Sequence, residues 1–371
     1  MRNLPLNAWN LHDCTPSASQ QLLLTAVLGG DDDALAAWRG WRGAQDIDVI
    51  DAASFRLLPL IYLRLKTLDP GDPLLPRLQV VYRHCWFKNQ MLFNQARGLL
   101  DTLEQAGVAC MLLKGAAMTP RYYPDAGQRF MHDIDVLVPA RQFDSAVACL
   151  LDARWQLQGS SPARLRLLRR WRFLHGASFR RDNAELDLHG QLSRFVWQDE
   201  ALLWGSARSQ QWQGREVRIP SATFMLYHCC VHGVRWSYAI LSWIPDALRM
   251  LADQDDPVDW PLLLRLGEQT RSVCQLYHAL AYLAATWSAA VPPAVLDALG
   301  SMETSPTERA EYAQLARRPR RSPGALAKRL WLRSCRYRQG GKPASRPIGP
   351  SPVGWLAYLA LYSLAPGNSR D

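Results

Sequence analysis

Hydrophobic and polar positions follow two different periods along the 371-residue chain. Over most of residues 1–106 and 201–300, apolar residues recur every three to four positions, which is typical of helices that bury one face. Between these regions, short apolar stretches at 108–113, 134–138 and 184–189 are typical of strands. The pattern therefore predicts a mostly helical α+β fold, in which a small mixed β-sheet is flanked by N- and C-terminal helical regions.

The same pattern divides the chain into four regions. We expect an N-terminal helical region at 1–106, an α/β core at 107–200, a helical bundle packed on the core at 201–300, and a basic, proline-rich region with a short apolar helix at 301–371. In the first region, Ser17 is placed to cap a helix over 17–28, and further helices are expected over 52–65 and 75–105.

Aromatic side chains recur at helical spacing within the N-terminal region. They are Trp38, Trp41, Tyr62, Tyr82, Trp86 and Phe87. We expect them to pack in the core, rather than to form a platform on which bases stack.

Carboxylates interrupt two of the apolar strands. Asp133 and Asp135 are two residues apart, so both side chains should leave the same face of the strand, about 6–7 Å apart. Glu185 and Asp187 repeat this spacing on the strand at 184–189. Carboxylates this close repel each other unless a cation or a shared proton compensates. Because Mg²⁺ prefers hard oxygen ligands and keeps positions open for phosphate oxygens, the pattern predicts a divalent-metal site.

These carboxylates belong to a longer series of motifs. The series is Leu113-Lys114-Gly115, Tyr123-Pro124, Arg129-Phe130-Met131-His132-Asp133-Ile134-Asp135-Val136-Leu137-Val138 and Asp187-Leu188-His189. In order and spacing it resembles the bacterial "uncharacterised nucleotidyltransferase" family, within the superfamily that has the polymerase-β-like fold. The region after the core is similar to the same family, whose H-x-x-x-H and W-x-x-D patterns correspond to His228, His232, Trp243 and Asp246.

The resemblance implies an enzyme that transfers a nucleoside monophosphate from an NTP, such as ATP, to an acceptor hydroxyl or phosphate and releases pyrophosphate. Mg²⁺ or Mn²⁺ is the implied cofactor, and Asp133, Asp135 and Asp187 are the implied catalytic metal ligands. The implied nucleotide-binding residues are Lys114, Gly115, Ala116 and Arg129. Ala116 departs from the superfamily, which usually has Ser or Gly there, and this removes one phosphate contact. Backbone N–H groups at a helix N-terminus can still bind phosphate.

Several of these residues have a second interpretation. Lys114 either pairs with phosphate or is solvated, and Arg129 either reaches the outer phosphates or pairs with Asp125. Glu185 rivals Asp187 as the third carboxylate. His132 and His189 flank the expected ligands, and either one can hydrogen-bond a carboxylate without acting as a base.

The histidines after the core are also open to two interpretations. His228 and His232 are four residues apart and so share one helix face. They form either a partly buried hydrogen-bonded pair or a zinc pair, although the sequence offers no obvious further zinc ligands. With Asp246, they are expected on the acceptor side of the site.

Composition adds constraints on class and compartment. The chain is 48% hydrophobic with 15 Trp, which is typical of a globular protein. Its 8 Cys show no CxxC motif and no zinc-like spacing, which favours a reducing compartment, and we expect a cytoplasmic protein. The sequence shows neither a signal peptide nor an apolar run long enough to span a bilayer.

Positive charge is concentrated at the C-terminal end. The formal net charge is +10, and residues 301–371 contain 13 Lys and Arg against 4 Asp and Glu, a net +9. The nearly neutral body is not typical of a nucleic-acid-binding surface. We expect the apolar helix at 354–367 to dock on the body, with peripheral membrane contact or a protein partner as alternatives. The five Arg of 163–173 form either a solvated face or a rim that attracts phosphate.

Two other functions remain open beside the enzyme. One is a catalytically weak nucleotide-binding scaffold that acts through a partner, which Ala116 favours and the intact carboxylates oppose. The other is addition of nucleotides to an RNA end, which the basic tail favours and the neutral body opposes. A small molecule, peptide or protein is therefore the expected acceptor, in preference to nucleic acid.

Overall fold

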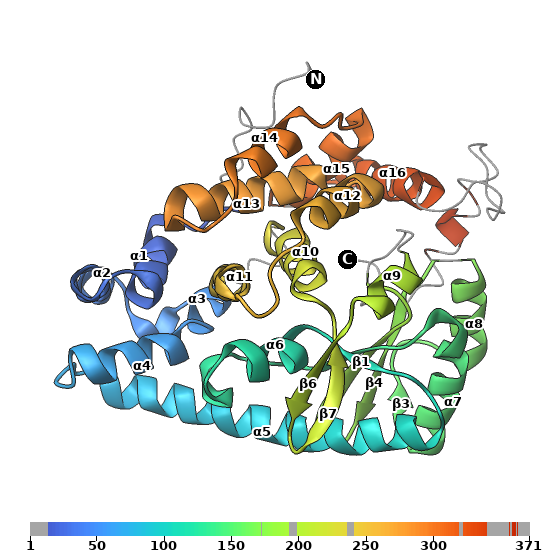
Figure 1. Cartoon of the computed structure of the whole chain (residues 1–371), viewed down its shortest axis with the longest axis horizontal. Helices are drawn as coiled ribbons and strands as arrows, with labels where there is room; N and C mark the ends of the chain where they lie inside the picture. Colours follow the sequence, from blue (N-terminus) through green and yellow to red (C-terminus); the bar gives the residue numbers. More distant parts are fainter. Residues whose placement is uncertain are drawn as a thin grey trace.

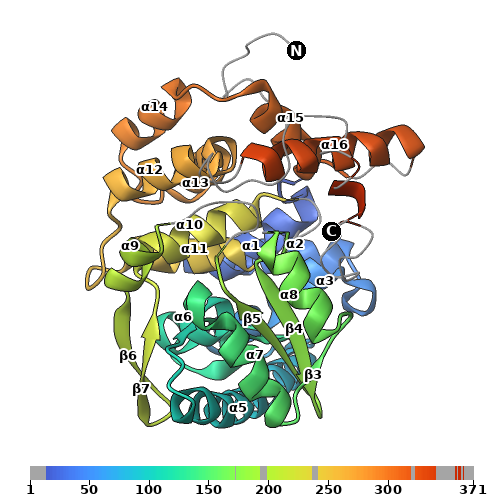
Figure 2. The same ribbon diagram turned by 90° about the vertical axis from the view of Figure 1, so that its right-hand side faces the viewer.

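The computed structural model describes residues 14–171, 173–192, 199–235, 241–318 and 322–339, together with residues 356, 358–360 and 362. The fold is mostly helical with a small sheet, as predicted (Figure 1). The long helix α5 (Leu75–Gln105) runs beneath both the N-terminal helices and the sheet, and the later helices lie above them (Figures 1 and 2).

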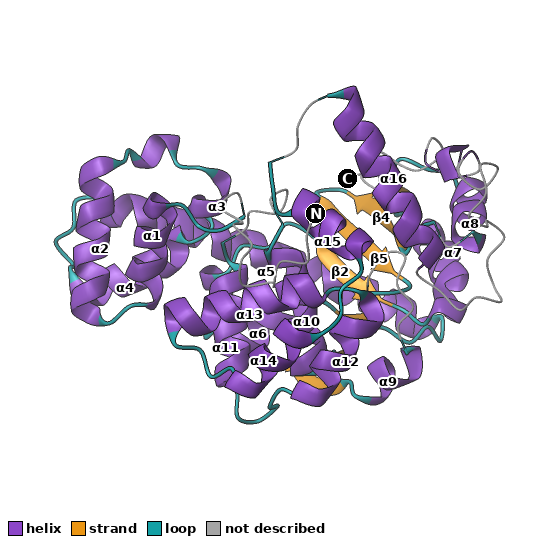
Figure 3. Cartoon of the chain, turned by 90° about the horizontal axis from the view of Figure 1, so that it is seen from above, coloured by secondary structure: helices purple, strands orange, loops and turns teal. Residues whose placement is uncertain are grey.

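The N-terminal helices form a cluster at one end of the molecule (Figure 3). They are α1 (Ala18–Leu28), α2 (Asp31–Ala44), α3 (Ala52–Phe55) and α4 (Leu58–Leu68), with a 3-10 turn η2 (Ile47–Val49). Ser17 caps α1 in a capping box with Gln20, as the sequence indicated. The single helix expected over 52–65 is wrong, because the chain starts a new helix near Pro59, whose missing N–H suits the first turn.

The aromatic side chains of this region separate into two groups. Trp38, Trp41 and Tyr62 are buried, and Tyr82 is partly buried against the same core, which confirms the prediction for these four. Trp86 and Phe87 are exposed on α5, so the prediction was wrong for these two. The exposed pair breaks the apolar period, because both lie on the side of α5 that faces away from the core.

The sheet has five strands in the order β1-β2-β5-β4-β3. The strands are β1 (Met111–Leu112), β2 (Ile134–Leu137), β3 (Gln156–Leu157), β4 (Gly176–Arg181) and β5 (Ala184–His189). Only β2 and β5 are parallel among the described pairs, and every strand of this sheet comes from the expected core. The tight turn after β4 contains Asp182 at φ 53°, a left-handed conformation that Asp tolerates.

Helices connect the strands of the sheet. They are α6 (Lys114–Tyr122), α7 (Phe143–Asp152) and α8 (Pro162–Arg170), with the 3-10 turns η3 (Ala126–Gln128) and η4 (Ala140–Gln142). Helix α6 begins directly after the short strand β1, and β2 returns beside β1 in the opposite direction. This arrangement brings the first turn of α6 next to the carboxylates of β2.

A β-hairpin interrupts the region that was expected to be helical throughout. Strands β6 (Arg208–Trp212) and β7 (Arg215–Ile219) pair across a turn in which Gln213 and Gly214 both have positive φ, 50° and 80°. Trp212 is buried against Phe93 of α5, with ring centroids 5.5 Å apart. The prediction missed this hairpin because its strands are rich in Arg and Gln and contain few apolar positions.

The remaining helices form the upper layers of the molecule (Figures 1 and 2). They are α9 (Glu200–Gly205), α10 (Ala222–Gly233), α11 (Trp243–Ala252), α12 (Trp260–Thr270), α13 (Val273–Trp287), α14 (Pro293–Ser301), α15 (Pro306–Leu315) and α16 (Pro323–Gln339). Helices α9, α10 and α11 are the lowest of these helices in the view of Figure 1, on the side of the sheet and α6. One hydrophobic cluster extends from α1 through the sheet to α15, so the expected regions share a core.

The C-terminal tail is only partly described. Most of the apolar segment 354–367 and part of the basic run lie outside the described residues. Tyr358 is buried, and its ring centroid is 5.4 Å from that of Phe173. Of the helices that the structure describes, none combines the length and the apolar character needed to cross a bilayer.

Candidate active site

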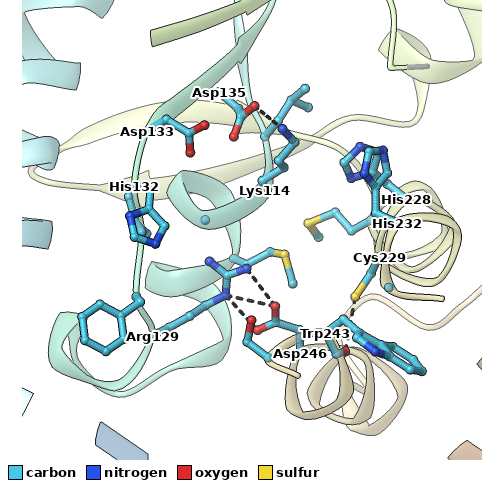
Figure 4. A pocket seen from close by; sticks show the side chains of 18 of the residues that line it. Lys114, Arg129, His132, Asp133, Asp135, His228, Cys229, His232, Trp243 and Asp246 are labelled. Carbon is cyan, nitrogen blue, oxygen red and sulfur yellow. Dashed lines mark hydrogen bonds and ion pairs between the residues drawn. The ribbon is translucent and has the colours of Figure 1, made fainter. Parts of the chain in front are cut away.

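A cavity of about 270 Å³ lies between the sheet and the helices α10 and α11. Figure 4 shows Lys114, Asp133 and Asp135 on the core side, facing His228 and His232 of α10. The cavity therefore joins the predicted core motifs to the predicted helical motifs.

Two of the predicted carboxylates are direct neighbours across parallel strands. Asp135 on β2 pairs in register with Asp187 on β5. One ligand atom from each of Asp135, Asp187 and His189 lies within 4.8 Å of the other two. The alternation along β5 directs Asp187 and His189 to the same face.

Asp135 accepts two hydrogen bonds through the same oxygen. The Nζ of Lys114 donates at 2.5 Å, and the Nε2 of His189 lies at 2.9 Å from Oδ1. Burial favours the neutral acid, but Lys114 and His189 outweigh it and hold the pKa of Asp135 below its usual value. Lys114 is therefore neither simply solvated nor unpaired, and it starts α6 with a left-handed φ of 45°.

The other carboxylates lie in different surroundings. Asp133 lines the cavity just before β2 but is outside the group formed by Asp135, Asp187 and His189. Burial and the neighbouring Asp135 raise the pKa of Asp133 to about 7. Glu185 is exposed and has Arg180 3.9 Å away, so it does not join the group.

The donor set fits a divalent cation. Asp187 accepts a hydrogen bond from Ser178 through Oδ1 at 2.6 Å, and Asp135 uses only Oδ1. The second oxygen of each carboxylate therefore has no hydrogen bond from any residue that the structure describes. Two carboxylates with unengaged oxygens and one imidazole are a suitable ligand set for a metal that prefers oxygen and nitrogen.

Glycine at position 115 is required by a close approach of side chains. A Cβ there would meet Cγ of Met131 at 2.7 Å and Nη1 of Arg129 at 2.8 Å. Gly115 lines the cavity, whereas Ala116 is buried behind its wall. The first turn of α6 thus presents its backbone and Lys114 to the cavity, with the guanidinium group of Arg129 beside it.

Arg129 forms an ion pair with Asp246 of α11, not with Asp125. Its Nε and Nη2 donate to Asp246 at 2.8 Å each (Figure 4). Tyr123 donates to the same carboxylate at 2.5 Å. Asn89 of α5 donates to the carbonyl of Arg129 at 2.6 Å, so backbone and side chain are both fixed. Asp125 instead accepts from Tyr82 at 2.8 Å.

His228 and His232 are partly buried in the cavity wall, with ring centroids 4.2 Å apart. Burial and the nearby Lys114 ammonium lower the pKa of His228 to about 3, so its imidazole is neutral near pH 7. Among the described residues, neither histidine belongs to a group of three metal-binding side chains. The zinc interpretation therefore has no support, and the pair faces the cavity as neutral imidazoles.

Several residues of the site were not predicted from the sequence. Ser178, which donates to Asp187, could have been found from the two-residue turn after β4. That turn sets the cross-strand register and so places Ser178 opposite Asp187. Asn89 and Arg56 come from helices far earlier in the chain, and no local pattern connects them with the carboxylates. The Arg side chains of α8 do not line the cavity, so the phosphate-rim interpretation of that cluster has no support.

Comparisons with known proteins place this geometry in context. The solved structure of the antibiotic-resistance factor ANT(2'')-Ia is 15% identical, covers 53% of this chain and 96% of its own, and has a TM-score of 0.34. An antigenic nucleotidyltransferase-like protein from Paracoccidioides brasiliensis is 16% identical, with 58% and 94% coverage and a TM-score of 0.32. No curated protein matches the chain. Residues 50–288 match the family described as "Uncharacterised nucleotidyltransferase", and the chain belongs to this family.

Proposed function

We propose that this protein is a Mg²⁺- or Mn²⁺-dependent nucleotidyltransferase, which transfers a nucleoside monophosphate from an NTP to an acceptor hydroxyl or phosphate. The observation that carries the proposal is the group of Asp135, Asp187 and His189, within 4.8 Å of one another beside a cavity lined by Lys114. Membership of the family supports the same reaction class.

Different residues are proposed to bind the cation and the nucleotide. Asp133, Asp135 and Asp187 are the proposed cation ligands, with His189 beside them. When bound, the divalent cation supplies positive charge that offsets the charge of the phosphate oxygens. Lys114 and the first N–H groups of α6 are the proposed ligands of those oxygens, because the N-terminus of a helix favours anions.

The reaction needs one proton acceptor near the attacking oxygen. Asp187 is proposed for this task as well, because an ionised carboxylate has about four lone-pair sites, so that it can bind the cation, accept from Ser178 and still take up a proton. The acceptor oxygen forms a bond to the α-phosphorus while the bond from this phosphorus to the β-bridging oxygen breaks. The electron pair of that bond leaves with pyrophosphate, and the acceptor proton passes to Asp187.

The test is thermal stabilisation by each of the four NTPs, with and without Mg²⁺, in the wild type and in Asp135→Asn. A ligand at one hundred times its dissociation constant stabilises the folded state by about 2.7 kcal/mol. We expect Mg²⁺-dependent stabilisation by at least one NTP in the wild type and none in the variant. Stabilisation that survives in Asp135→Asn would contradict the proposed site, and NTP binding without any release of pyrophosphate would favour the nucleotide-binding scaffold.

A further inference from the structure

Arg56 lines the cavity, although it belongs neither to the sequence motifs nor to the α/β core. It directly follows the short helix α3, which Asp51 caps at its other end. The neighbouring Phe55 packs against Phe130, with ring centroids 5.4 Å apart, and this contact holds α3 against the loop before β2. An arginine of the N-terminal helices thereby reaches the wall of the proposed active site.

The charge of Arg56 is not compensated by the protein. In the part of the chain that the structure describes, its guanidinium group has no hydrogen bond and no ion pair, and only its backbone N–H donates, to the carbonyl of Ser54. The other two cations of the cavity wall are both paired, Lys114 with Asp135 and Arg129 with Asp246. Burial and repulsion by Arg129 lower the pKa of Arg56, and attraction by Asp133 opposes them only in part.

Arg129 offers a second donor group next to Arg56. Asp246 engages Nε and Nη2, while Nη1 has no hydrogen bond to any described residue. Nη1 lies 2.8 Å from the point that a Cβ on Gly115 would occupy, so it is at the first turn of α6. A fixed guanidinium edge and an uncompensated guanidinium therefore face one cavity.

Two like charges beside a cavity are unfavourable unless an anion lies between them. We propose that Arg56 and the Nη1 of Arg129 bind the β- and γ-phosphates of the NTP, which form the pyrophosphate leaving group. Guanidinium groups suit this task because their planar N–H donors match phosphate oxygens. This inference rests on the proposed function and identifies the residues that hold the charge as the leaving group departs.

A simpler explanation would give Arg56 only the task of neutralising Asp133. The two side chains form no ion pair within 4.0 Å, although both line the cavity. If neutralisation were the task, replacing Arg56 would change cation binding and leave pyrophosphate binding intact. The two explanations thus predict different ligand specificities for the same variant.

The experiment is calorimetric titration of the full chain with pyrophosphate in Mg²⁺, and in parallel with AMP. We compare the wild type with Arg56→Gln, with Arg56→Lys, and with Arg39→Gln, which removes an exposed arginine from the same N-terminal region. Arg56→Gln should weaken pyrophosphate binding by about tenfold or more, because a charged hydrogen bond contributes about 1.5–3 kcal/mol. AMP binding should change less than about twofold, and Arg39→Gln should behave as the wild type.

The variants also separate a binding role from a structural one. Because Arg56 is unpaired, Arg56→Gln should leave the melting temperature of the ligand-free protein unchanged or raised. Arg56→Lys should recover only part of the pyrophosphate affinity, since lysine keeps the charge but loses the planar donors.

Two results would overturn the inference. Equal losses of pyrophosphate and AMP affinity in Arg56→Gln, or no loss of either, would show that Arg56 does not bind the outer phosphates, while the proposed reaction would remain. A wild-type protein that binds neither pyrophosphate nor any NTP in Mg²⁺ would overturn the inference and the proposed function together.

Discussion

Asp135 and Asp187 lie side by side in register on the parallel strands β2 and β5, although 51 residues separate them in the sequence. Each carboxylate has one oxygen held by neighbours and one oxygen unengaged among the described residues. This relationship makes the pair, and not the D-x-D motif alone, the centre of the proposed cation site.

Asp187→Asn should abolish Mn²⁺- or Mg²⁺-dependent NTP binding without unfolding the protein. The amide oxygen of Asn can still accept the hydrogen bond from Ser178, but it brings no negative charge to a cation. Transfer activity should fall by at least about a hundredfold, which is about 2.7 kcal/mol of transition-state stabilisation. Pyrophosphate release and thermal shift measure the two effects.

The matched control for this variant is Glu185→Gln. Glu185 is on the same strand, two residues earlier, but it is exposed and outside the group. Glu185→Gln should keep the wild-type transfer activity and the wild-type thermal shift on NTP binding. Equal losses in both variants would show that the site has been assigned to the wrong carboxylate.

Gly115→Ala should destabilise the protein and weaken nucleotide binding. The new methyl group would meet Met131 at 2.7 Å and Arg129 at 2.8 Å, so both side chains must move. Overpacking of this kind costs about 1–3 kcal/mol, measured as the free energy of unfolding in urea.

Gly98→Ala is the control for this substitution. Gly98 lies inside α5 with open space around it, so alanine should stabilise the helix by about 0.5–1 kcal/mol. The two Gly→Ala variants should therefore change stability in opposite directions. A stable Gly115→Ala protein with normal NTP binding would argue against a close approach at the start of α6.

Asp246→Asn should destabilise the fold strongly. Asp246 is only 2% exposed and accepts from Arg129 and Tyr123, so its loss leaves a buried arginine uncompensated. Breaking a buried pair by removing one partner costs about 3–5 kcal/mol.

Asp253→Asn provides the comparison, because Arg121 of α6 pairs with Asp253 at 2.6 Å in a more exposed place. This second pair links α6 to the residue that follows α11, and its carboxylate is more exposed than that of Asp246, so its loss should cost less. Chemical denaturation of both variants measures the difference. Similar costs for the two substitutions would mean that the Arg129 pair is no more deeply desolvated than its neighbour.

The neutral state of His228 should make stability depend on pH. Its pKa is lowered to about 3 by burial and by nearby charges, so protons bind the unfolded state more readily. The titratable groups that act on it are Lys114, Asp135, His189 and Arg235. The contribution of His228 to the free energy of unfolding is fully present above the ordinary histidine pKa near 6.5. It declines as the pH falls from there towards 3.

The corresponding test is the pH dependence of unfolding in the wild type and in His228→Gln. Between pH 7 and pH 5 the variant should lose up to about 2 kcal/mol less than the wild type. Asp133 changes stability with pH in the opposite direction, because its raised pKa favours proton uptake by the folded state. Its contribution is the same in the wild type and the variant, so it cancels when the two pH profiles are compared. Identical pH profiles would show that His228 is not kept neutral by the fold.

Alternation along a strand fixes the face of each side chain, and Asp135 and Asp187 lie on strands as the sequence pattern indicated. Asp133 instead precedes β2 and is outside the group that they form with His189. The partner of Arg129 was not predicted, since the choice between Asp125 and Asp246 depends on where α11 packs. The hairpin β6–β7 was missed because its buried positions are few, and its turn was the only strong local signal.

The 31-residue helix α5 fixes the spacing between the segments that contact it. Asn89 on this helix bonds the carbonyls of Ala126 and Arg129, while Phe93, one turn later, contacts the hairpin at Trp212. One residue inserted or deleted between such points would turn all later positions by about 100°. Insertions and deletions within α5, between these contacts, should therefore be tolerated less well than at many positions nearer the carboxylates.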